Sequence, residues 1–129
     1  MSAFAKVKEY LLQLEYNILE EDAPEELFIV ENEEAGIYKL LIDCEDPILI
    51  IEYPLFQLKK DNTGALKELL QKNREIVHGA FALADDGTVL FRDTLQLENL
   101  DFNELEGTLE SLELLLAEYG NRLIELSKQ

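Results

Sequence analysis

The last third of the chain has a helical pattern that any fold of this sequence must accommodate. Apolar residues recur there at spacings of four and three, which places them on one face of an α-helix. These residues are Leu105, Leu109, Leu112, Leu116, Tyr119, Leu123 and Leu126. Just upstream, Asp101 can cap the helix, Glu104 completes a capping box and Leu100 forms a hydrophobic staple with Leu105. The pattern predicts a long helix whose apolar stripe is buried.

Two kinds of surface can bury this stripe. One is a sheet of the same chain, and the other is a second copy of the helix. Leu114 and Leu115 widen the stripe beyond the narrow seam of a coiled coil. The sequence therefore favours packing within the fold, with self-association as the alternative.

Upstream patterns predict two shorter helices. Phe4, Val7, Leu11 and Leu14 share one helical face, so residues 2–16 are predicted as a helix capped by Ser2. The second helix is predicted over about 63–77, where leucines recur at helical spacing, and Gly79 suits the position beyond its end.

Short β-branched and alternating runs predict the strands. Three of them, 27–30, 37–44 and 48–53, precede the second helix, with a turn at Asp46-Pro47 and Pro54 ending the third. Two more follow it, around Phe81–Leu83 and over 89–97. Asp86-Gly87 between these two is a hairpin signal, and Asp93 suggests a bulge.

Together the patterns predict a single α+β domain over residues 1–129. The expected order is helix, three strands, helix, two strands and a long helix. Because short turns join successive strands, we expect an antiparallel sheet of about five strands with the helices packed on it.

The charge balance restricts the class of partner. Asp and Glu number 28 against 11 Lys and Arg, giving a net charge of −17 in a chain that is 47% hydrophobic. Such a chain is apolar enough to fold, but it repels phosphate backbones and anionic lipids. We therefore expect a neutral or basic protein or peptide as partner, and neither nucleic acid nor membrane.

Cysteine content and hydropathy favour a cytoplasmic location. Cys44 is the only cysteine, so no intramolecular disulfide is possible, and a lone thiol suits a reducing compartment. No stretch approaches the roughly 18 consecutive apolar residues of a membrane-spanning helix.

Three groups of residues are candidates for chemistry. Asp85-Asp86-Gly87 offers oxygens to a metal ion, but its strand-like flanks favour a hairpin turn. Cys44 and His78 are a conceivable nucleophile and base, although no local signature supports the pair. The acidic residues of segment 20–34 suit a hard cation or a basic peptide, or form a solvated face. We predict no catalytic residue, no metal site and no cofactor.

The second half of the chain resembles the type III secretion chaperone-like and YbjN-like superfamily, which has the CesT/Tir-chaperone fold. The resemblance is carried by Leu69, Leu70 and Asn73 in a helix, by Gly79, Phe81 and Leu83, by the Asp86-Gly87 turn, and by Leu95, Leu100, Leu105 and the amphipathic last helix. The order of the earlier elements agrees as well, so the resemblance covers nearly the whole chain.

The resemblance implies a non-enzymatic chaperone, commonly a homodimer, that holds a client segment in extended form. Client contacts are expected on Phe4, Val7 and Leu11 or at a sheet edge, and dimer contacts on Leu69, Leu70 and Phe81. Core packing explains the same residues. The alternative function is that of a YbjN-like regulatory or stress-related adaptor without an extended client.

Overall fold

The computed structural model describes residues 1–60 and 62–129. In chain order its elements are α1 (Ala3–Gln13), β1 (Asn17–Asp22), β2 (Leu27–Asn32), the 3-10 turn η1 (Glu33–Ala35), β3 (Ile37–Glu45), β4 (Ile48–Gln57), α2 (Thr63–Lys72), the 3-10 turn η2 (Asn73–Glu75), β5 (Ala80–Leu83), β6 (Thr88–Gln96) and α3 (Phe102–Lys128).

The strands form one antiparallel sheet in the order β1-β2-β3-β4-β6-β5. This confirms the predicted α+β class with one more strand than expected. The additional strand, β1, carries Glu20, Glu21 and Asp22, and acidic residues have low strand propensity. It forms because its backbone pairs with β2, from Asn17 opposite Glu31 to Asp22 opposite Leu27.

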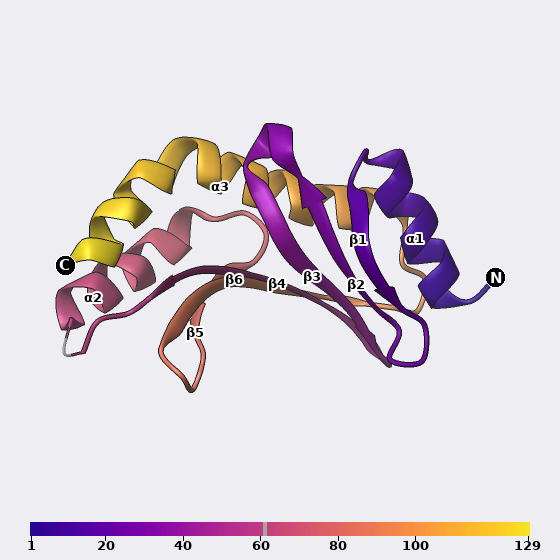
Figure 1. Ribbon diagram of the computed structural model, residues 1–129, viewed down its shortest axis with the longest axis horizontal. Helices are drawn as coiled ribbons and strands as arrows, with labels where there is room; N and C mark the ends of the chain where they lie inside the picture. The colour runs from indigo at the N-terminus through magenta and orange to yellow at the C-terminus, as the bar shows by residue number, and fades with distance from the viewer. Residues whose placement is uncertain (61) are drawn as a thin grey trace.

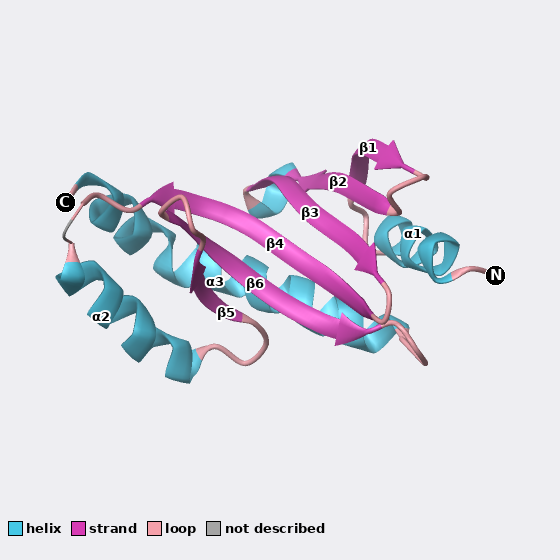
Figure 2. Cartoon of the chain, turned by 90° about the horizontal axis from the view of Figure 1, so that it is seen from below, coloured by secondary structure: helices cyan, strands magenta, loops and turns pink. Residues whose placement is uncertain are grey.

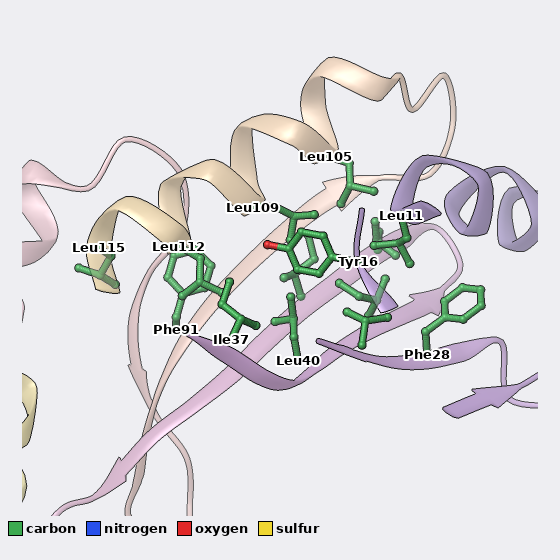
Figure 3. Packing of buried hydrophobic residues seen from close by; sticks show 14 of the residues in the cluster. Leu11, Tyr16, Phe28, Ile37, Leu40, Phe91, Leu105, Leu109, Leu112 and Leu115 are labelled. Carbon is green, nitrogen blue, oxygen red and sulfur yellow. The ribbon is translucent and has the colours of Figure 1, made fainter. Parts of the chain in front are cut away.

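The long helix α3 runs along one side of the sheet (Figure 1). Seen from the opposite side, β4 and β6 lie in front of it (Figure 2). Leu105, Leu109 and Leu112 project from α3 into the core, with Leu105 near Leu11 of α1 and Leu112 near Phe91 (Figure 3), and all three are almost completely buried. The stripe is therefore buried within the fold, as the width of the pattern favoured.

Local hydrogen bonds fix the start of α3 and satisfy its buried polar residue, Thr108. Asp101 and Glu104 form the predicted capping box. The predicted bulge at Asp93 is wrong, because Asp93 pairs regularly with Ile51. Its carboxylate instead accepts a 2.7 Å hydrogen bond from the buried Thr108 hydroxyl, which satisfies a polar residue under the helix.

Two predicted boundaries extend too far and one stops too early. Helix α1 ends at Gln13 because Glu15 has a φ of 63°, which turns Tyr16 back into the core. Helix α2 ends at Lys72 and continues only as η2. Pro54 does not end β4, which continues to Gln57, because the proline lies beyond the last residue that pairs with β3 and next to a bulge, where a missing N–H is tolerated.

Asp86-Gly87 forms the predicted hairpin connection between β5 and β6. Gly87 has a φ of 89°, and the Asp86 carboxylate accepts a 3.0 Å hydrogen bond from the Thr88 N–H. These oxygens therefore stabilise a turn.

Candidate protein-binding surfaces

None of the described helices lies over the side of the sheet that faces away from α3 (Figure 2). We call this side the open face. Along each strand its residues alternate with fully buried core residues. It comprises Leu27, Ile29, Leu41, Ile48, Ile50 and Leu90, all partly exposed. The register places Ile29 directly opposite Leu41, so the apolar surface is continuous from one strand to the next.

Asp43 lies in the middle of the open face, opposite Leu27 on one side and Ile50 on the other. Its Oδ1 atom is buried and has no hydrogen-bond partner among the described residues. Desolvation raises the pKa of Asp43, and nearby carboxylates, Glu45 first, raise it further. A carboxylate oxygen without a partner favours a bound group that brings a hydrogen-bond donor or a positive charge.

The three α1 residues expected to contact a client lie on the inner side of that helix. Val7 and Leu11 are completely buried in the core. Phe4 is partly exposed and stacks on Phe28 with ring centroids 4.4 Å apart. In this structure, therefore, only Phe4 of the three has accessible side-chain surface.

The three residues expected at a dimer interface do come together, where α2 packs beside β5. Leu69 and Phe81 are buried, while Leu70 is 69% exposed. With Leu83, which is 50% exposed, and Leu66 they line a small cavity of about 70 Å³. We call these five residues the α2–β5 surface.

Asn73 fixes β5 against the end of α2. Its side-chain amide donates to the Phe81 carbonyl at 3.3 Å and accepts from the Phe81 N–H at 2.7 Å. Because these are the outward-facing backbone groups of an edge strand, the contact occupies part of that edge. The resemblance to the family included Asn73, but the sequence does not reveal this role.

Helix α2 is fastened to α3 by a partly buried polar network. Glu68 accepts two 2.7 Å hydrogen bonds from the Arg122 guanidinium and one of 2.5 Å from the Tyr119 hydroxyl. The Arg122 and Tyr119 hydrogen bonds lower the pKa of Glu68 to about 2. Burial and the Glu68 hydrogen bond raise the pKa of Tyr119 to about 12.

Glu68→Gln should lower the free energy of unfolding by about 1 kcal/mol at pH 7, because the pair is roughly one-third exposed and screened by water. The folded-state pKa is depressed, so the contribution is present above the ordinary glutamate pKa and lost as pH falls toward 2. Urea unfolding at several pH values measures it. A difference from the unchanged protein that persists at pH 2 would contradict this account.

Cys44 and His78 lie in different surroundings, on β3 and beside α3 respectively. Cys44 is 5% exposed on β3, and burial raises the pKa of its thiol to about 11. His78 exchanges hydrogen bonds with Ser111 through its backbone, and its ring lies against Gly107 of α3. A thiol of this pKa is protonated at neutral pH and is a poor nucleophile.

Among the described residues, no group of three or more His, Cys, Asp or Glu is arranged to hold a metal ion. Within residues 1–60 and 62–129, no helix has the length and hydropathy of a membrane-spanning segment.

A groove between η1, β4 and α3 was not predicted from the sequence. Its volume is about 810 Å³, and we call it the β4 groove. Glu33 and Glu34, from the acidic segment, lie at its rim, while Leu55 and Leu116 lie inside it. The only sequence signal was Pro54, because proline within a strand indicates an edge or a bulge.

Comparison with known proteins gives a family match over the whole chain. The family model CesT_Tir_1 matches residues 1–129. No curated protein matches the sequence.

Solved structures with the same fold include secretion chaperones. The type III secretion chaperone SycH of Yersinia pestis, solved with a stable fragment of YscM2, is 17% identical over 98% of this chain and 100% of its own, with a TM-score of 0.62. A chain of the heterodimeric ExoU–SpcU complex from the type III secretion system of Pseudomonas aeruginosa is 17% identical over 92% and 94%, with a TM-score of 0.67. YbjN of E. coli is 12% identical over 92% of both chains, also with a TM-score of 0.67.

At these identities the solved structures establish the fold, and the whole-chain family match establishes the relationship. Type III chaperones and YbjN both lie among the structural neighbours, as the resemblance implied. The chain belongs to the CesT_Tir_1 family.

Proposed function

We propose that this protein is a non-enzymatic, cytoplasmic chaperone that holds a segment of a client protein. The observation that carries the proposal is the open face, an apolar surface left uncovered by the described helices in a chain of net charge −17. Apolar side chains around the unpaired Asp43 oxygen suit a segment that combines apolar and basic residues. Phe4 extends the proposed client surface on α1, and Val7 and Leu11 support it from beneath.

Capture of partners from the native host's lysate, followed by limited proteolysis and mass spectrometry, tests this function. We expect one protein to be held through a protease-resistant segment that contains Lys or Arg. The double variant Ile29→Thr, Ile50→Thr keeps β-branched residues in the strands but removes apolar surface, so it should lose the client. Capture of a folded partner that is unaffected by these substitutions would contradict the chaperone function.

A YbjN-like adaptor is the second candidate function. It is favoured by the fold, because the TM-score with YbjN equals that with the ExoU–SpcU chain. An adaptor should bind a folded regulator and ignore unfolded segments. Capture of a folded partner that the Ile29→Thr, Ile50→Thr variant still binds would therefore support this second function.

Cys44→Ser tests the absence of enzymatic activity. Because the Cys44 thiol is buried and its pKa is raised, we expect client binding to be unchanged by this substitution. An activity toward the captured partner that disappears in Cys44→Ser would contradict a purely binding role.

We further propose that the protein forms a homodimer through the α2–β5 surface. Leu70 and Leu83 are exposed beside buried Leu69 and Phe81, so a second copy can bury a contiguous apolar area there. Leu70→Asp should convert the dimer to a monomer in light scattering. Leu12→Asp, at a similarly exposed leucine on α1, is the matched control and should leave the mass unchanged. An equal effect of both variants would exclude this interface.

A further inference from the structure

Strand β4 pairs with β3 over only part of its length. Its first half, Ile48–Glu52, pairs with β3 from Glu45 to Leu41. Beyond that point β3 turns away with β2, through a register shift near Asn32 and a φ of 90° at Lys39. The second half of β4 continues to Gln57 and pairs only with β6. Figure 2 shows β4 extending past the end of β3. One edge of this half-strand therefore has no strand partner among the described residues.

The β4 groove lies beside this free edge. Leu55 and Phe56 of β4 line it on one side, and Leu116 and Ile124 of α3 line it on the other. A volume of about 810 Å³ is within the range of roughly 300–1,000 Å³ that binding pockets occupy. The groove therefore combines an apolar lining with a free backbone edge, which offers the carbonyl but no N–H at Pro54.

Tyr53 holds one end of the groove open. Its hydroxyl accepts a 3.1 Å hydrogen bond from the Tyr38 N–H and donates one of 3.3 Å to the Gly36 carbonyl. These contacts hold the connection between η1 and β3 on the Tyr53 hydroxyl, away from the β4 backbone. The connection therefore does not pair with β4, and the groove between them stays open.

Helix α3 leaves room in the groove because small residues face it. Gly120 lies one helical turn from both Leu116 and Ile124, and a Cβ atom added there would meet nothing within 4 Å. Ala117 lies beside it. A glycine inside a helix costs about 0.5–1 kcal/mol relative to alanine. Gly120 therefore makes α3 slightly less stable than alanine would, at the position where the groove is open.

The charges at the groove have one sign. Glu33, Glu34 and Glu113 line it, and among the described lining residues there is no Lys, Arg or His. Glu33 and Glu34 are exposed, and the Glu113 carboxylate accepts a 2.7 Å hydrogen bond from Tyr16. The groove therefore attracts a positively charged segment.

We propose that the β4 groove receives an extended, basic segment of another protein, which adds as a strand to the free edge of β4. Its apolar side chains lie against Leu55 and Leu116, and its Lys or Arg side chains lie near Glu33 and Glu34. This proposal deepens the proposed chaperone function, on which it rests, by naming a binding site for a basic segment and the way in which the segment is held there.

A second copy of this chain suits the groove poorly. Of the two outer strands of the sheet, β1 carries Glu20, Glu21 and Asp22, which would be repelled by the acidic rim. The other, β5, has part of its outer edge occupied by Asn73. The favoured occupant is therefore a different protein.

Fluorescence anisotropy with a labelled peptide of alternating valine and lysine tests the site. We expect this peptide to bind and a peptide of alternating valine and glutamate not to bind. Two N-methylated versions distinguish strand pairing from simple charge attraction, one methylated at the odd positions and one at the even positions. Since alternate N–H groups point to opposite edges of a strand, one version should lose binding and the other should keep it.

Two variants locate the peptide in the groove. Gly120→Phe fills the open space and should abolish binding, whereas Gln13→Phe adds the same ring to an exposed site on α1 and should have no effect. The double variant Glu33→Lys, Glu34→Lys should weaken binding about tenfold at low salt. Its control is Glu9→Lys, Glu98→Lys, which changes the net charge equally at exposed sites outside the groove. Circular dichroism verifies that each variant is folded.

The outcomes separate this site from the chaperone function itself. If both N-methylated peptides bind equally, or if both charge variants weaken binding equally, strand addition in the groove is refuted. If the host client is captured but its binding survives Gly120→Phe, the chaperone function stands and the groove proposal fails. If the peptide binds as expected but no client segment is captured, the groove stands and the proposed function fails.

Discussion

Gly79→Ala should lower the free energy of unfolding by about 3 kcal/mol, the sum of backbone strain and overpacking. Gly79 has a φ of 79°, a conformation that residues with a Cβ atom rarely adopt. The added Cβ would also lie 2.5 Å from Cζ of Phe91 and 3.1 Å from the Arg92 carbonyl oxygen. Because Phe91 is fully buried in the centre of the core, its ring has little room to move.

Gly36→Ala is the matched control for this substitution. Gly36 has nearly the same φ, 77°, but a Cβ atom there would meet nothing within 4 Å. Only the strain of the left-handed conformation remains, and we expect a loss of about 1 kcal/mol. Urea unfolding monitored by circular dichroism gives both values. Equal losses in the two variants would show that contact with Phe91 contributes nothing.

The features that were predictable from the sequence are those determined by nearby residues. The capping box at Asp101 and Glu104 and the stripe of α3 depend on spacings within one helix, and both are present as predicted. Gly79 was also singled out, although for the end of a helix that stops earlier. Its positive φ instead occurs in the loop that leads into β5.

The features that were missed depend on pairing between distant segments. Strand β1 has a sequence unsuited to a strand, and β2 stabilises it by supplying backbone partners. Pro54 normally ends a ladder, but β4 continues past it because β3 has already turned away. The β4 groove has the same origin, so no local pattern predicts it.

Helical periodicity was a poor guide to the residues that bind a partner. Helical periodicity identifies the apolar face of a helix, and that face is usually the one buried in the fold. Val7 and Leu11 follow this rule and are completely buried. Leu70, which belongs both to the helical period and to the family resemblance, is an exception, because it is exposed beside buried Leu69. Accessible apolar residues thus lie mostly outside the periodic stripe.

Leu112→Ala should lower the free energy of unfolding by about 3 kcal/mol, because it removes a completely buried side chain between α3 and the sheet (Figure 3). Leu114→Ala, two residues further along the same helix, makes the same chemical change where the side chain is 55% exposed. We expect the second variant to change stability by less than about 0.5 kcal/mol.

The comparison also tests which surface buries the stripe of α3. If the sheet of the same chain buries it, the loss in Leu112→Ala should not depend on protein concentration. If the stripe were instead shared with a second copy of α3, the urea midpoint of the parent protein would still depend on concentration in the Leu70→Asp background, where the proposed α2–β5 dimer is absent, and Leu112→Ala would abolish that dependence. Urea unfolding at two protein concentrations distinguishes these cases, and a concentration-dependent loss in Leu112→Ala would contradict the packing of α3 on its own sheet.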